Sequence, residues 1–244
     1  MDLHVIMHVP KTGGQTIRNQ LCAHLELGVA FVHVGPFGDK HARERGLTLW
    51  KERSDTDREQ VRVLAGHDLS IHTPDLVPGN RNVKFVGMFR DPAARMVSNY
   101  NYNVQRKWED VGKPAPDWAW WYRGQKRNFI SRWIKEKFLA RTFDEGQSDE
   151  SLFEEIAAAL DGFWLLGTMP HFDAFVAKLH ADIGLPPASE DRWSVAGRNY
   201  PVRLTLSEDI QRQVARDHPV DCAIYDLVQR RVDAVFGAAD ATNR

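Results

Sequence analysis

A glycine-rich turn near the N-terminus combines residues that bind anions. Positions 10–16 read PKTGGQT and lie between an apolar, β-branched run and a segment with helical periodicity. Backbone N–H groups and the helix dipole favour an anion at such a junction. Lys11 supplies a positive charge, and the other candidate phosphate contacts are Thr12, Gly13, Gly14, Gln15 and Thr16.

The order of these residues differs from that of the magnesium-dependent nucleotide loop. In G-x-x-x-x-G-K-[ST] the lysine follows the glycines, and the next Ser or Thr binds magnesium. Here Lys11 precedes Gly13 and Gly14. This order counts against a phosphoryl transferase (kinase) that uses ATP and magnesium, which is kept as one alternative. An ordinary turn without a ligand is another.

A second candidate anion contact follows the apolar run at 83–89. Arg90 ends that run, and Asp91 with Pro92 suits the N-cap and first position of a helix. Ser98 lies about two helical turns further on, so Arg90 and Ser98 can reach one oxyanion, although Arg90 could instead form a structural pair with Asp91. Together with the first turn, this motif predicts a nucleotide with two separated phosphate groups.

The elements that position these motifs are short apolar runs alternating with helical segments. The predicted strands are residues 3–9, 29–34, 61–66, 83–89 and 163–169. Apolar strands between helices indicate a parallel sheet covered on both faces. We expect an α/β fold with a P-loop-like parallel sheet flanked by helices and a largely helical C-terminal half. Both anion motifs then fall at the carboxyl ends of strands, where such sheets bind ligands.

Helical periodicity and capping signals predict the helices. One follows the first turn, and others are expected around 47–58, from Asp91 to about Arg106 and from Pro170 to about Ile183. Thr205 and Glu208 form a capping box that opens a helix to Asp217. A last amphipathic helix begins near Pro219 and carries Ile224, Leu227, Val228, Val232 and Val235.

Composition bounds the class of protein. The chain has 244 residues, 43% of them hydrophobic, which predicts a single domain over 1–244. A net charge of -1 argues against nucleic acid as the main partner. There is no long apolar segment and no signal-peptide pattern, so we expect a cytoplasmic protein without an integral membrane segment. Cys22 and Cys222 fit neither a disulfide framework nor a zinc site, and no metal is expected.

The two anion motifs resemble those of sulfotransferases that use 3′-phosphoadenosine 5′-phosphosulfate (PAPS). HVPKTGGQT resembles their 5′-phosphosulfate loop, and FRDPAARMVSNY resembles their 3′-phosphate motif. The similarity is closest to the uronyl and heparan 2-O-sulfotransferase branch of the carbohydrate enzymes, as a bacterial-type soluble member. It implies that Arg90 and Ser98 bind the 3′-phosphate, that 3′,5′-adenosine bisphosphate (PAP) is the product and that no metal is required.

The same resemblance suggests a catalytic base. Gly66-His67 stands where that branch has a Gly-His step, which implies that His67 removes the acceptor's proton. A near-neutral pKa suits histidine to this role, and Lys11 suits neutralisation of the leaving phosphate. His72 is the nearest rival for the base, and a purely structural role for His67 is the other possibility.

The acceptor is expected to be a hydroxyl of a sugar or another small molecule. Residues 108–161 are predicted to form a helical insertion on the acceptor side, with candidate contacts at Trp121, Arg127, Asn128 and Arg132. Positions 104–141 hold ten Lys/Arg and four Asp/Glu, a net +6, whereas 142–161 hold seven acids and no base, a net -7. Arg198 in a late polar loop is a further candidate contact for the 3′-phosphate. The alternatives are solvated helix faces, tryptophans that pack a helical subdomain, and a non-catalytic anion-binding or interaction domain.

Overall fold

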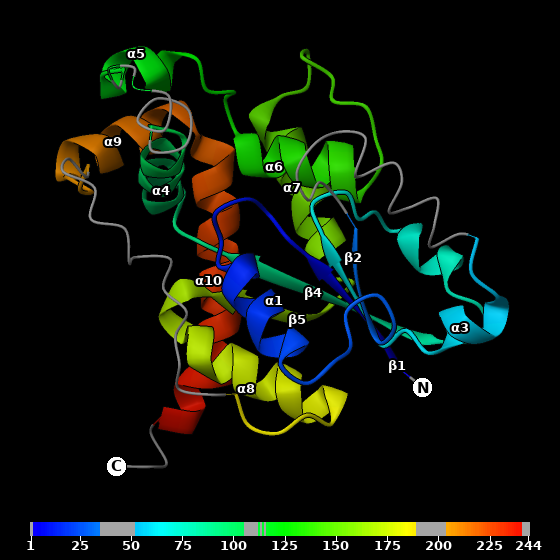
Figure 1. Cartoon of the computed structure of the whole chain (residues 1–244). Helices are drawn as coiled ribbons and strands as arrows, with labels where there is room; N and C mark the ends of the chain where they lie inside the picture. The colour runs from blue at the N-terminus through cyan, green and yellow to red at the C-terminus, as the bar shows by residue number, and fades with distance from the viewer. Residues whose placement is uncertain are drawn as a thin grey trace.

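The computed structural model describes residues 2–34, 52–104, 112, 114, 116–188 and 204–240. Its centre is a parallel sheet in the order β2-β3-β1-β4-β5 (Figure 1). The strands are β1 (Asp2–Met7), β2 (Phe31–Val34), β3 (Val63–Gly66), β4 (Asn82–Phe89) and β5 (Phe163–Thr168). The predicted α/β fold is confirmed, with strand ends displaced by a few residues at most.

The strand order creates a point where the connections diverge. From β1 the chain crosses β3 to reach β2, whereas from β4 it moves the opposite way to β5. Since β1 and β4 are neighbours, the segments that follow them separate at the carboxyl edge of the sheet. Open α/β sheets bind ligands at such a switch point.

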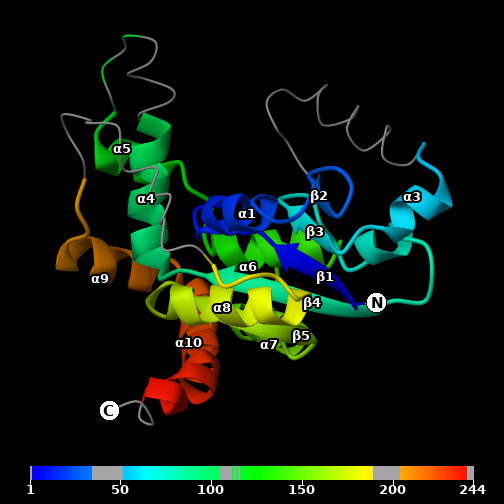
Figure 2. The ribbon, with the colours of Figure 1, turned by 60° about the horizontal axis from the view of Figure 1, so that its bottom comes forward.

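Helices cover both faces of the sheet and extend its carboxyl edge (Figures 1 and 2). The α-helices of the described residues are α1 (Gly14–Cys22), α3 (Asp55–Glu59), α4 (Pro92–Val104), α5 (Trp118–Arg123), α6 (Phe129–Trp133), α7 (Asp149–Leu160), α8 (Phe172–Ile183), α9 (Glu208–Asp217) and α10 (Pro219–Asp240). Shorter turns are η1 (Thr73–Leu76), the π-helical η3 (Ile134–Phe138) and η4 (Met169–His171). Among the described residues, no helix is both long and apolar enough to cross a membrane.

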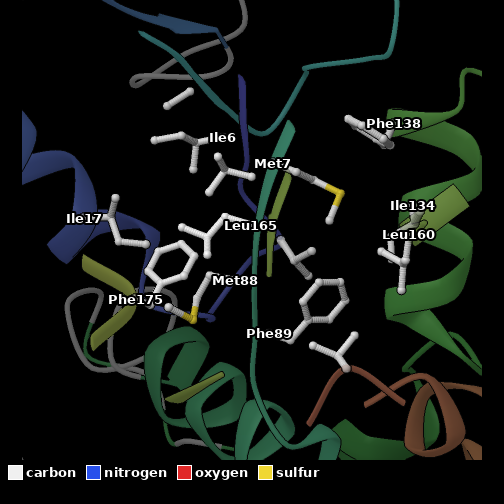
Figure 3. Close-up of a cluster of buried hydrophobic side chains, with 14 of the residues drawn as sticks. Ile6, Met7, Ile17, Met88, Phe89, Ile134, Phe138, Leu160, Leu165 and Phe175 are labelled. Atoms are coloured by element: carbon white, nitrogen blue, oxygen red, sulfur yellow. The ribbon is translucent and has the colours of Figure 1, made fainter. Parts of the chain in front are cut away.

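Alternation along the strands divides the core into two layers (Figure 3). Ile6 and Met88 face α1 and α8, where they lie near Ile17 and Phe175. The next residue of each strand points to the other face. The side chains on that face are Met7, Phe89, Ile134, Phe138 and Leu160. Much of the predicted 108–161 insertion, namely α6, η3 and α7, therefore belongs to a layer of the core.

A smaller cluster joins the helices beyond the carboxyl edge of the sheet. It contains Ala93, Met96 and Val97 of α4, Trp121 and Tyr122 of α5, and Ile210 and Val214 of α9. All of these side chains are buried. Helix α4 begins two residues after Arg90. Its position is thus fixed by packing against α5 and α9 as well as by its connection to β4.

Local capping signals were correct at one helix and wrong at another. Asp91 Oδ1 accepts the N–H of Ala94 at 2.7 Å, as expected of the N-cap before Pro92. The later helix starts at Glu208, and its N-cap is Ser207, which accepts the N–H of Ile210 at 3.3 Å. The predicted capping box of Thr205 and Glu208 is wrong because Ser207, directly before the first turn, is the residue placed to accept from it.

Other boundaries also move. The strand expected to reach residue 169 ends at Thr168, and α8 begins at Phe172 after a short 3₁₀ turn. The apolar face predicted for α10 includes Val235, but Val235 is 57% exposed and Phe236 is buried instead. The prediction is therefore wrong at that turn of the helix. Part of the helix expected around 47–58 falls outside the described residues, and α3 accounts for its end.

A buried carboxylate ties α10 to α6. Asp221 accepts the N–H groups of Ile130 and Ser131 at 2.9 and 2.8 Å and the Ser131 hydroxyl at 2.7 Å. Nearby, Asn128 Oδ1 accepts the N–H of Val220 at 3.2 Å. These bonds satisfy donors at the start of both helices and fix the layer that backs the sheet.

Replacing this carboxylate should destabilise the protein. Asp221→Ala leaves several buried donors without an acceptor and should lower the free energy of unfolding by about 3 kcal/mol. The exposed Asp226→Ala on the same helix is the control, with a change within about 0.5 kcal/mol. Urea unfolding measures both, and equal stability of the two variants would contradict this role for Asp221.

Candidate functional site

The predicted phosphate loop joins β1 to α1 in a tight turn. Lys11 and Gly13 both have left-handed backbone angles, with φ of 73° and 90°. Gly13 is the N-cap of α1 and has no side chain that could accept from the first-turn N–H groups. A Cβ at Gly13 would lie 3.1 Å from the Phe172 ring. The turn thus presents backbone donors and the positive end of α1 at one place.

The side chains of this loop differ in their roles. Thr12 is buried, and its hydroxyl donates to the Val9 carbonyl at 2.8 Å. This bond joins the two ends of the turn, so the Thr12 hydroxyl stabilises the loop conformation. Gln15 is exposed and Thr16 is half-buried, both in the first turn of α1.

The structure brings the second anion motif to the first. Arg90 follows β4, and its Nη1 lies 3.5 Å from the Lys11 carbonyl oxygen. The Lys11 ammonium lies 3.9 Å from the centroid of the Tyr102 ring on α4. Ser98 is four residues before Tyr102 and shares its helix face. Lys11, Arg90 and the Ser98 face of α4 therefore converge at the switch point between β1 and β4.

His67, the predicted base, is attached to the same region through β3. Its Nδ1 lies 2.8 Å from the backbone carbonyl oxygen of His8. Because a carbonyl only accepts, Nδ1 of the neutral ring carries the hydrogen and Nε2 carries the lone pair. This is the tautomer in which Nε2 can accept a proton. His72, its rival, is exposed in the turn before η1, with Nδ1 4.0 Å from Asp75 Oδ2.

Three histidine rings cluster at the strand ends. The His8 and His67 centroids are 4.1 Å apart, and those of His33 and His67 are 6.4 Å apart. Burial, with His67 nearby, lowers the pKa of His8 to about 3 and that of His33 to about 4. Burial also lowers the pKa of His67, against the opposing effects of the His8 carbonyl and Asp68. All three rings are therefore neutral at pH 7.

The cluster is not arranged as a metal site. Within the described residues, no group of three His, Cys, Asp or Glu side chains could hold a metal ion. The chemistry available here is anion binding by Lys11, Arg90 and backbone N–H groups, together with proton acceptance by an imidazole.

The basic segment expected at the acceptor site is paired with the acidic segment that follows it. Arg127 contacts Asp149 at 2.6 Å, and Arg132 makes a two-bond contact with Glu145 at 2.8 and 2.7 Å. The Arg132 guanidinium also lies 3.8 Å from the centroid of the Phe143 ring. The opposite charges of the two segments therefore neutralise one another within the fold.

Glu155 shows the same pairing most strongly. Lys135 and Arg141 contact its two carboxylate oxygens at 2.8 and 2.9 Å. Although burial alone would raise the pKa of Glu155, hydrogen bonds from Lys135, Gln147 and Arg141 lower it to about 2. The carboxylate thus stays charged and bound down to acidic pH.

The remaining acceptor candidates also have structural partners. Asn128 is buried, and its N–H donates to His218 Nδ1 at 2.9 Å. Trp121 is buried against Tyr100 and Trp118, with ring centroids 5.4 and 5.5 Å away. Contact of these residues, or of Arg127 and Arg132, with an acceptor stays a prediction. Arg198 lies outside the described residues.

Sequence reasoning missed His8 and Tyr102. His8 lies inside the strand predicted at 3–9, and Tyr102 lies inside the helix predicted from Asp91 to about Arg106, and neither was given a role. A signal for His8 existed, because β1 and β3 are parallel neighbours in which Met7 pairs with Gly66. The next residue of each segment, His8 and His67, must then lie side by side.

Comparison with known proteins finds similarity among solved structures alone. No protein-family model matches the sequence, and no curated protein is significantly similar to it. Among solved structures, the chain is similar to mouse sulfotransferase SULT7A1 complexed with PAP, with 13% sequence identity and a TM-score of 0.41. The match covers 88% of this chain and 63% of that one, so the chain spans less than two thirds of that protein.

The neutral histidines predict a specific pH dependence of stability. In the unfolded chain His33 takes up a proton below its ordinary pKa of 6.5, whereas in the folded protein it stays neutral down to about pH 4. Folding is therefore destabilised as pH falls through this window. His33→Phe should make the decline shallower, by up to about 1.4 kcal/mol per pH unit.

Urea unfolding between about pH 6 and pH 4.5 measures this slope. The exposed His72→Phe serves as the control and should keep the slope of the parent protein. Equal slopes for the parent and His33→Phe would show that His33 is protonated in the folded protein.

Proposed function

We propose that the protein transfers a sulfuryl group from PAPS to a hydroxyl of a sugar or another small acceptor. The observation that carries this proposal is the meeting of two anion motifs from different strands, with Arg90 Nη1 3.5 Å from the Lys11 carbonyl. PAPS carries anionic groups at its 5′ and 3′ ends. Two adjacent basic motifs provide a separate contact for each.

The donor groups present suit such a nucleotide. The amides at the start of α1 and the Lys11 ammonium would hold the 5′-phosphosulfate, while Arg90 and Ser98 would hold the 3′-phosphate. All of these groups donate to phosphate oxygens without a metal. The motif resemblance to PAPS-dependent sulfotransferases supports the same assignment.

The loop gives less support to an ATP- and magnesium-dependent phosphoryl transferase. In the P-loop the hydroxyl after the lysine binds magnesium. Here the residue after Lys11 is Thr12, whose buried hydroxyl donates to the Val9 carbonyl. That hydroxyl is committed to the turn, and the anion site depends on lysine and arginine side chains.

The chemistry follows from the assigned positions. PAPS supplies a sulfuryl group whose bond to the 5′-phosphate oxygen breaks as the acceptor oxygen forms a new bond to sulfur. His67 Nε2 takes the hydroxyl proton of the acceptor, and Lys11 stabilises the charge that grows on the departing phosphate oxygen. The products are the sulfated acceptor and PAP. Because burial keeps the pKa of His67 low, this base is neutral and competent at pH 7.

The 3′-phosphate assignment can be tested by calorimetric titration with PAP and with AMP, which lacks that phosphate. Arg90→Ala should weaken PAP binding about 10- to 100-fold, since a hydrogen bond to a charged group contributes roughly 1.5–3 kcal/mol. AMP affinity should change little. The control is Arg212→Ala, an exposed arginine paired within α9. Unchanged PAP affinity in Arg90→Ala would refute this role.

The base assignment predicts a separation of binding from turnover. His67→Asn should reduce turnover roughly 10²–10⁴-fold, the usual contribution of a general base. PAP affinity should stay within about twofold, because this residue is assigned to the acceptor and not to the nucleotide. Turnover is measured as PAP release with an acceptor found by screening hydroxylated sugars, phenols and lipids, with the exposed His72→Asn as control. Parent-level turnover in His67→Asn would rule out this base, and PAP binding with no turnover on any acceptor would favour a non-catalytic anion-binding domain.

A further inference from the structure

The backbone of His8 is bound to the end of β3 on both sides. Its N–H donates to the Gly66 carbonyl at 3.2 Å. Its own carbonyl accepts from His67 Nδ1 at 2.8 Å. One residue therefore continues the pairing of β1 with β3 and fixes the tautomer of the predicted base.

The His8 ring reaches in the other direction, toward the phosphate loop. A Cβ added at Gly14, the first residue of α1, would lie 2.1 Å from Cδ2 and Nε2 of this ring. The ring thus fills the space that any side chain at position 14 would need. The His8 ring also packs against the His67 ring, at a centroid distance of 4.1 Å and an interplanar angle of 30°.

We propose that His8 is a positioning residue that couples the phosphate loop to His67, with its ring packed between Gly14 and the imidazole of the base. The inference rests on the proposed function for the role of both partners. It goes beyond that function because it assigns a residue outside both anion motifs and explains why position 14 requires glycine.

The ring acts as an uncharged spacer. Burial, followed by His67, His33, Arg18 and Lys11, keeps the pKa of His8 at about 3. The uncharged His8 ring packs against His67, whereas the carboxylate of Asp68 acts to raise the pKa of His67. Without the His8 ring, water would reach the His67 ring, and the pKa of His67 would rise toward its ordinary value of 6.5.

A suppression experiment tests the contact with the loop. Gly14 does not have a positive φ, so Gly14→Ala introduces no backbone strain, and alanine favours a helix more than glycine does. Gly14→Ala should nevertheless weaken PAP binding about tenfold, because the new methyl group displaces the His8 ring and with it the start of α1. His8→Ala/Gly14→Ala should recover most of that affinity, since the colliding ring is gone.

The coupling to the base is read from the pKa of His67, measured from its ring C–H resonances by NMR without nucleotide. His8→Ala should raise this pKa toward 6.5, and His8→Phe, which keeps the bulk of the ring, should restore the low value. The acid limb of the turnover profile should move to higher pH in His8→Ala and return in His8→Phe. If His8→Ala does not fold, the pKa of His67 in His8→Phe and Gly14→Ala tests the coupling instead. This pKa should rise in Gly14→Ala and stay low in His8→Phe.

The proposal would be overturned if the pKa of His67 did not change in His8→Ala. It would also be overturned if Gly14→Ala lowered PAP affinity equally in the presence and in the absence of the His8 ring. Failure of the proposed function looks different. In that case the parent protein would not bind PAP, although the NMR titration would still show whether His8 shields His67.

Discussion

The candidate site depends on the position of β1 between two parallel neighbours. Met7 pairs with Gly66 of β3 and with Gly87 of β4, so the chain leaves all three strands at one edge of the sheet. The segments that follow must then meet. The predicted phosphate loop follows β1, His67 follows β3 and Arg90 follows β4, so the strand ends alone bring these residues together.

This edge carries costs that the rest of the fold offsets. Lys11 has a left-handed backbone angle, which costs a non-glycine residue about 1 kcal/mol. His8 and His33 are kept neutral by burial, which favours unfolding at acidic pH. The two core layers and the Asp221 bonds provide the opposing stability. Strain and buried titratable groups concentrated at one edge are typical of a functional site.

The features that sequence predicted well are those set by neighbouring residues. Apolar runs fixed the strands because both faces of the sheet are covered, and Asp91 followed by Pro92 identified the start of α4. Ser207 and Thr205 carry the same capping chemistry, so composition alone could not choose between them. At Val235 and Phe236, tertiary packing decided which side chain turns inward.

The features that sequence could not supply join distant segments. The +6 and -7 segments gave two hypotheses, acceptor contacts and solvated helix faces. Neither named the pairs that form in the folded chain, Arg132 with Glu145 and Arg127 with Asp149. The cation–π contact between Lys11 and Tyr102 joins residues 91 positions apart and has no local signal. The His8 and His67 pair was accessible in principle, but only once the order of β1 and β3 was known.

In the proposed site, two separate basic motifs hold a nucleotide bearing a 3′-phosphate without a metal. A thermal-shift comparison of PAP in EDTA with ATP in magnesium tests this assignment. A ligand at about 100 times its Kd stabilises the folded state by roughly 2.7 kcal/mol, which for a chain of this size raises Tm by about 5–10 °C. We expect such a shift with PAP in EDTA and a much smaller one with ATP and magnesium. A larger, magnesium-dependent shift with ATP would refute the assignment.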